Sequence, residues 1–154
     1  MAQSVEELAY ELSLAAVSQQ ESRANELRSR TGTLLAAAAV TASFFGSRAV
    51  VASDVDPAGV LALVAFLCGL GAGLIVLVPR RLILEFRGSV LLGAARAAHA
   101  GLPEAYEAAS TWIEGFHEQN RNVLASLARW YTAALAAVGL EVVLWTASVG
   151  DKLL

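Results

Sequence analysis

A single carboxylate interrupts the last apolar stretch of the chain. Glu141 has eleven uncharged residues before it, back to Arg129, and nine after it, as far as Gly150. A charged side chain that faces hydrocarbon costs about 3 kcal/mol on insertion scales, so such residues usually face other helices and find a partner. Arg48 is the expected partner, because it is the only other ionisable residue that we expect at a comparable depth. We therefore predict an intramembrane polar pair of Arg48 and Glu141.

Other roles for Glu141 stay open from the sequence. The carboxyl group can be protonated and hydrogen-bonded to a neighbour, with a role in packing only. It can also face the axis of an oligomer or a pore. A proton relay has the least support, because no second acidic residue in the stretch extends a chain.

Four arginines form two basic clusters at the flanks of apolar stretches. Arg28 and Arg30 precede one stretch, and Arg80 and Arg81 follow another. Their simplest role is to hold these flanks in the cytosol. They are also expected at the same level on two helices, so together they are the candidate site for a phosphate-bearing ligand.

The sequence contains no catalytic or metal-binding constellation. His99 and His117 are expected on solvated helix faces, and the segment "HEQNR" lacks the second histidine of a zinc-binding helix. The lone Cys68 excludes a disulfide within the chain. We expect no enzyme activity, no metal site and no nucleic-acid partner.

The elements that carry these residues are predicted to be membrane-spanning helices. Of the 154 residues, 56% are hydrophobic and only 16% are charged, and the mean hydropathy is +0.57. This composition is typical of an integral membrane protein. Three stretches reach the roughly 20 residues that a helix needs to cross a bilayer. They are residues 31–51, 58–79 and 128–149.

The distribution of arginine predicts the orientation of these spans. With the N-terminus inside, nine of the eleven basic residues are cytosolic, and only Arg48 and Lys152 fall outside. The outer segment "SDVDP" is acidic instead. Because lysine and arginine concentrate on the cytosolic side, we predict a multi-pass protein of the bacterial cytoplasmic (inner) membrane. Its N-terminus is expected inside and its C-terminus outside.

The segments next to the spans are predicted to continue as helices into the cytosol. Residues 4–30 and 80–127 would form this helical stalk, with Pro79 kinking its helix rather than ending it. The tripeptide "GLP" at 101–103 ends one helix and starts the next. The expected fold is therefore all-α, with three long helices in a single domain over 1–154, half in the membrane and half in the stalk.

A heptad-like stripe follows the last of these helices from stalk to membrane. One row steps by seven residues and a companion row lies three residues later. The rows are Tyr106, Ile113, Asn120, Leu127, Ala134 and Glu141, and Ala109, Phe116, Val123, Trp130, Ala137 and Leu144. Because such a stripe faces other helices, Glu141 is expected to point away from lipid.

Two glycines of the second span are candidates for close helix packing. Gly69 and Gly73 form a G-x-x-x-G pattern, and small residues at this spacing let membrane helices approach each other. The pattern fits packing within the chain or between subunits.

Three pieces of the chain resemble the transmembrane effectors of bacterial Pycsar antiphage systems. The polar helix ending in "ANELRSRTGTLLAAAAVTASFFG" is similar to the family's charged lead-in, although Arg28 and Arg30 stand where an Asp and a Lys are often found. The segment "LVPRRLIL" resembles its span closed by proline and basic residues. The block "FHEQNRNVLASLARWYTAALAAVGLEVVLW" resembles its final block, with matching positions at Asn120, Arg129 and Trp130 or Tyr131.

The resemblance implies a membrane protein that stays silent until a signal activates it. In that family the functional partner is a nucleotide cyclase, and the ligand is a cyclic pyrimidine mononucleotide. The activated effector then compromises the inner membrane and stops growth of the infected cell, which is abortive infection. We expect a homo-oligomer in the lipid bilayer. Two other functions fit the spans: a holin-like permeabiliser that needs no ligand, and a membrane anchor whose stalk docks a partner protein.

Overall fold

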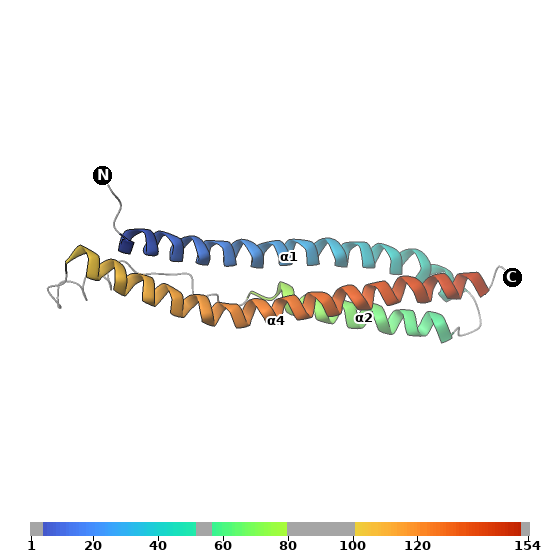
Figure 1. Cartoon of the computed structure of the whole chain (residues 1–154). Coiled ribbons are helices and arrows are strands. Elements are labelled where there is room, and N and C mark those ends of the chain that lie inside the picture. Colours follow the sequence, from blue (N-terminus) through green and yellow to red (C-terminus); the bar gives the residue numbers. More distant parts are fainter. Residues whose placement is uncertain (1–4, 52–56, 80–100, 152–154) are drawn as a thin grey trace. The chain divides into compact units, whose positions relative to one another are not determined.

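The computed structural model describes residues 5–51, 57–79 and 101–151, apart from the side chains of residues 6, 48–51 and 151. These ranges hold three helices and no strand (Figure 1). The helices are α1 (Val5–Val51), α2 (Pro57–Leu77) and α4 (Leu102–Asp151). The prediction of an all-α fold is confirmed.

Helix α1 runs for 47 residues without a break. It contains no proline, and after Gly32 its turns are rich in alanine, the residue with the highest helix propensity. Its hydroxyl side chains bond back to the helix itself; the Thr31 hydroxyl, for example, donates to the Leu27 carbonyl at 2.7 Å. The expected single helix from residue 4 to about 48 is therefore confirmed from Val5 onward.

Helix α2 spans 21 residues and ends at Leu77. The expectation that this helix continues through Pro79 with a kink is wrong. Proline has no N–H, and its ring disfavours the helical conformation for the residue before it, so the helix stops short of Val78. The stalk predicted over residues 80–100 lies outside the described residues.

Helix α4 is the longest, with 50 residues. It begins directly after Gly101, and the Ala105 N–H donates to the Gly101 carbonyl at 3.1 Å. Pro103 occupies the first turn, where its missing N–H leaves no hydrogen bond unmade. The predicted restart at "GLP" is confirmed.

The chain divides into two compact units. In its described part, unit 1 consists of residues 5–25 and 101–125. The rings of Tyr10 and Tyr106 have centroids 5.5 Å apart, and the Gln20 side-chain amide donates to the His117 carbonyl at 3.0 Å. Tyr10 and Tyr106 are 96 positions apart in the sequence, and Gln20 and His117 are 97 apart. Because this separation stays nearly constant along the helices, the two segments run parallel.

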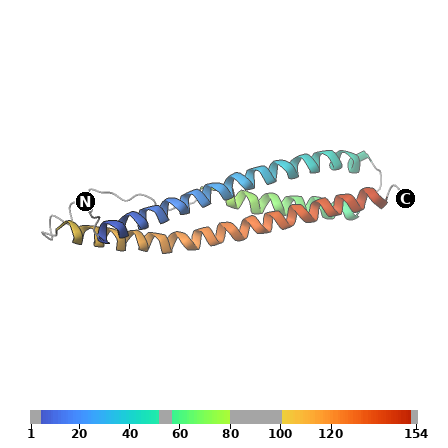
Figure 2. The ribbon, with the colours of Figure 1, turned by 45° about the horizontal axis from the view of Figure 1, so that its top comes forward.

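Unit 2 consists, in its described part, of residues 26–51, 57–79 and 126–151. Within this unit α2 runs antiparallel to α4 in both ribbon views (Figures 1 and 2). Much of its core consists of small side chains, which let the three helices pack closely. The buried alanines are Ala38, Ala62, Ala65, Ala72 and Ala134.

Two helices in the described part of the chain are long and apolar enough to cross a membrane. The most apolar stretch of α2 has a mean hydropathy of 2.7, and that of α4 has 1.7. Only 33% and 28% of these stretches are buried inside the protein, so most of their residues face outward. Helix α1 does not qualify over its described side chains, which end at Ser47 and include many alanine, serine and threonine residues. The span over 31–51 stays a prediction.

Candidate functional site

Glu141 is the buried carboxyl group of unit 2. Its side chain is fully buried, with 0% of its surface exposed. Among the described residues neither Oε1 nor Oε2 has a hydrogen-bond partner. An unpartnered carboxyl group inside a protein is unfavourable whether it is charged or neutral, because either form leaves polar atoms unsatisfied. Glu141 is therefore the least satisfied side chain that the structure describes.

Trp145 lies one helical turn beyond Glu141 on the same helix and is 4% exposed. Its indole Nε1 is also buried without a hydrogen-bond partner within 3.5 Å in the described structure, and its N–H is the donor that acts on the carboxyl group of Glu141. The indole stacks on Phe45 of α1, with ring centroids 6.0 Å apart and planes at 16°. Glu141 and Trp145 thus form an acceptor and a donor side by side, next to an aromatic contact between α1 and α4.

The heptad pattern did not predict this aromatic contact, because its companion row lies three residues after each heptad position. Ala134 and Glu141 of the first row are fully buried as expected. In unit 2, however, the buried companions are Val138 and Trp145, four residues later, while Trp130 is 40% exposed. Helix α4 contacts both α1 and α2 in this unit, so its packed face is wider than the two-row seam of a coiled coil. The i, i+4 spacing from Glu141 would have identified Trp145.

The two glycines of the G-x-x-x-G pattern lie against different helices of the same chain. A Cβ built at Gly69 would meet the Val138 Cγ2 at 3.3 Å and the Ala134 carbonyl oxygen at 3.6 Å, so Gly69 faces α4. One built at Gly73 would lie 2.8 Å from the Leu35 methyl groups, so Gly73 faces α1. Both glycines are buried and bring α2 close to its neighbours within the chain.

The predicted partner of Glu141 lies outside the described side chains. The backbone of Arg48 belongs to α1, but its side chain is not described. The pair of Arg48 and Glu141 therefore stays a prediction.

The four arginines proposed for a phosphate-bearing ligand are only partly described. Arg30 forms an ion pair and hydrogen bond with Glu26, one turn before it on α1. Arg28 is half-buried and also has interactions of its own. Arg80 and Arg81 lie outside the described residues, so the cluster of four stays a prediction.

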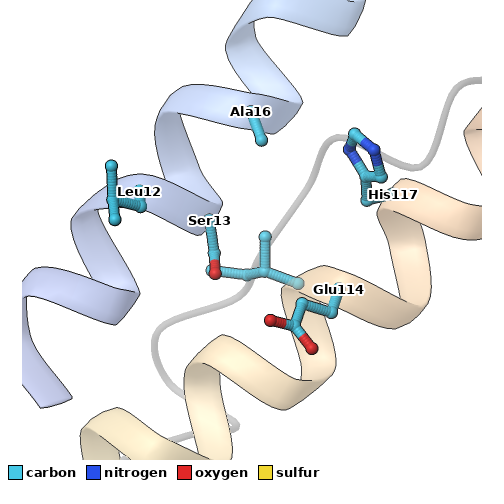
Figure 3. A pocket seen from close by; sticks show the side chains of 6 residues that line it. Leu12, Ser13, Ala16, Glu114 and His117 are labelled. Atoms are coloured by element: carbon cyan, nitrogen blue, oxygen red, sulfur yellow. The ribbon is translucent and has the colours of Figure 1, made fainter.

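Unit 1 contains a small groove of about 230 Å³ between α1 and α4. Figure 3 shows Leu12, Ser13 and Ala16 of α1 across from Glu114 and His117 of α4. Its apolar lining comes from Leu12, Ala16 and Ile113, and its polar lining consists of one hydroxyl, one carboxylate and one imidazole. Nδ1 of His117 is buried without a partner in the described structure. His117 is thus half-buried beside a groove, not on the fully solvated face that was expected.

Comparisons with protein-family models, with curated proteins and with solved structures found no match. No group of three or more His, Cys, Asp or Glu side chains suited to a metal ion occurs in the described ranges. The chemistry that the described site offers is therefore that of one buried carboxyl group within a bundle of apolar helices.

Proposed function

We propose that the chain is an integral membrane protein of the bacterial inner membrane, whose activated form disrupts that membrane. One observation carries this proposal: unit 2 exposes large apolar side chains around a helix without charge. Helix α2 contains no charged residue, and its exposed large residues occur on nearly every turn. They are Val60, Leu61, Leu63, Val64, Leu67 and Leu74, each 48–56% exposed.

Lipid accounts for this exposure better than water does. Fully burying a Leu or Val side chain stabilises a protein by about 1.5–3 kcal/mol, so a soluble helix would turn most of these residues inward. In a bilayer the same surfaces contact hydrocarbon. The 21 residues of α2, at about 1.5 Å per residue, match the hydrocarbon thickness of roughly 30 Å.

The finer part of the proposal is a nucleotide-signalled antiphage effector. Its support is the resemblance of three sequence blocks to Pycsar transmembrane effectors, together with the presence of a second helical unit that carries charged side chains. The ligand would be a cyclic pyrimidine mononucleotide made by a partner cyclase. It must bind one packing of the stalk more tightly than another by a few kcal/mol in order to shift the population. Arg28, Arg30, Arg80 and Arg81 remain its candidate contacts.

Liposome leakage tests this function directly. Purified full-length protein in liposomes of bacterial lipids should release a trapped dye when cyclic UMP or cyclic CMP is added, and should stay silent with cyclic AMP. Release without any nucleotide would instead support the holin-like permeabiliser. No release under any condition would leave the anchor or scaffold as the remaining function.

Topology is tested separately with reporter fusions. A reporter fused after Leu154 should signal from outside the cytoplasmic membrane, and one inserted at Gly101 should signal from the cytosol. The same side for both fusions would refute the span over 128–149. The reverse pattern, with Gly101 outside and Leu154 in the cytosol, would refute the span over 31–51, because only two crossings would then follow an N-terminus inside.

A further inference from the structure

Glu141 is fully buried in unit 2, whose core contains many small side chains. Ala38 of α1 is 1% exposed and lines the core. Since α2 runs antiparallel to α4 and Gly69 lies against Ala134 and Val138, the register brings Ala65 to the level of Glu141. Water that entered between these alanines after a displacement of one helix would hydrate the carboxyl group. A carboxylate gains more from such water than any apolar neighbour does.

The Trp145–Phe45 stack forms an apolar layer directly beside this carboxyl group. The two rings are nearly parallel, their centroids lie 6.0 Å apart, and they come from different helices. Apolar constrictions of this kind keep a path closed because water leaves them. Separating α1 from α4 would break the stack and expose Glu141 in one movement.

We propose that Glu141 is the cation-selecting carboxylate of the path that opens when the protein disrupts its membrane, and that the Trp145–Phe45 stack closes this path at rest. The proposal rests on the membrane-disrupting function above and names its ion specificity. Within the described parts of 31–47, 57–79 and 130–150, Glu141 is the only charged residue. Arg48, its predicted partner, follows this stretch of α1, and its side chain is not described. Because opening the bundle between α1 and α4 separates this pair, a path lined by these residues carries one fixed negative charge per chain.

The size of the expected selectivity follows from Coulomb's law. In a water-filled path, a unit charge about 7 Å from an ion changes the ion's energy by about RT. Because cations gain this energy and anions lose it, one carboxylate favours K⁺ over Cl⁻ by about sevenfold. More than one chain around the path would raise this ratio.

The test uses full-length protein in planar lipid bilayers under a KCl gradient, and it needs no ligand. Phe45→Ala removes one ring of the stack, so this variant should conduct without nucleotide. Phe44→Ala is the matched control, because Phe44 is the neighbouring ring but is 61% exposed. The control should stay as silent as the wild type. A silent Phe45→Ala variant whose helix content and detergent elution match the wild type would overturn the closing role of the stack.

Selectivity is read from the reversal potential of the Phe45→Ala variant. It should be cation-selective, Glu141→Gln in the same background should lose most of the selectivity, and Glu141→Asp should keep it. An unselective current in Phe45→Ala, or an unchanged reversal potential in Glu141→Gln, would overturn the proposal. If Phe45→Ala conducts cations but the wild type never responds to cyclic UMP or cyclic CMP, the nucleotide-gated function falls and the ion specificity stands.

Discussion

Unit 1 and unit 2 both expose large apolar side chains, but they differ in whether charged residues stand among these side chains. In unit 1 the exposed Leu12 and Trp112 have exposed carboxylates nearby in sequence, Glu11 and Glu114. In α2 of unit 2 no charged residue separates the exposed leucines. Exposed apolar residues alone therefore do not distinguish a membrane surface from a wetted one, whereas a continuous surface without charge does.

The cores of the two units differ in a second way. Unit 1 buries Gln20 and Asn120. The Gln20 amide N–H donates to the His117 carbonyl, although Gln20 Oε1 has no partner among the described residues, and Asn120 has interactions of its own. Unit 2 buries Glu141 with neither oxygen partnered among the described residues. A buried amide that makes one of its hydrogen bonds costs less free energy than a buried carboxyl group that makes none, so Glu141 lowers the stability of its unit more than Gln20 does.

The largest expected effect comes from placing a charge on the exposed surface of each unit. Leu67→Arg puts a guanidinium on the lipid side of α2 at a cost of about 3 kcal/mol, so the chain should largely leave the membrane fraction after carbonate extraction. Leu14→Arg is the matched control in unit 1, where the exposed fraction of the leucine is similar, 49% against 56%. Equal membrane retention of both variants would contradict the membrane assignment of unit 2.

Close packing within unit 2 is tested at its glycines. Gly69→Val should lower thermal stability in detergent by about 1–3 kcal/mol, because the new side chain meets Val138 and the backbone of α4. Gly71→Val serves as the control, since a Cβ there meets nothing within 4 Å. If Gly71→Val destabilised the protein as much, packing between subunits on the other face of α2 would be the better explanation.

Replacing the buried carboxyl group should raise the stability of the protein, whereas the glycine replacement should lower it. Glu141→Leu should raise the free energy of unfolding by about 1–3 kcal/mol, because it removes two buried oxygens that have no partner among the described residues. Thermal unfolding in detergent measures this. A loss of stability that Arg48→Met restores in the double variant would show that the predicted pair exists, as for other buried ion pairs.

The smallest effect is expected for the ion pair of Arg30 and Glu26, whose side chains are 62% and 57% exposed. Glu26→Gln should change stability by about 0.3–0.5 kcal/mol or less, as for other pairs one turn apart on a helix surface. Thermal unfolding at low and at 1 M salt checks this. A salt-sensitive loss several times larger would mean that the pair belongs to a wider charge network in the stalk.

The sequence by itself determined the helices and the apolar character of two of them. Uninterrupted runs without proline led to α1 and α4, "GLP" marked the start of α4, and the charge-free run around Cys68 predicted α2 as a span. These features are local, because a proline or a charge acts on the few residues next to it. The end of α2 before Pro79 was misjudged because a helix is free to kink or to end at a proline, and neighbouring contacts decide between the two.

Only the tertiary structure decided which residues meet across helices. Two contacts join residues far apart in sequence: the stack of Phe45 on Trp145 and the contact of Gly73 with Leu35. The full burial of Glu141 likewise depends on helices that are distant in sequence. A seven-residue pattern specifies one face of one helix, but not how wide that face becomes when two other helices pack on it. For this reason the sequence predicted Glu141 on the packed side of α4. The burial of Trp145 one turn away could be assigned only from the packing of α1 and α2 on this helix.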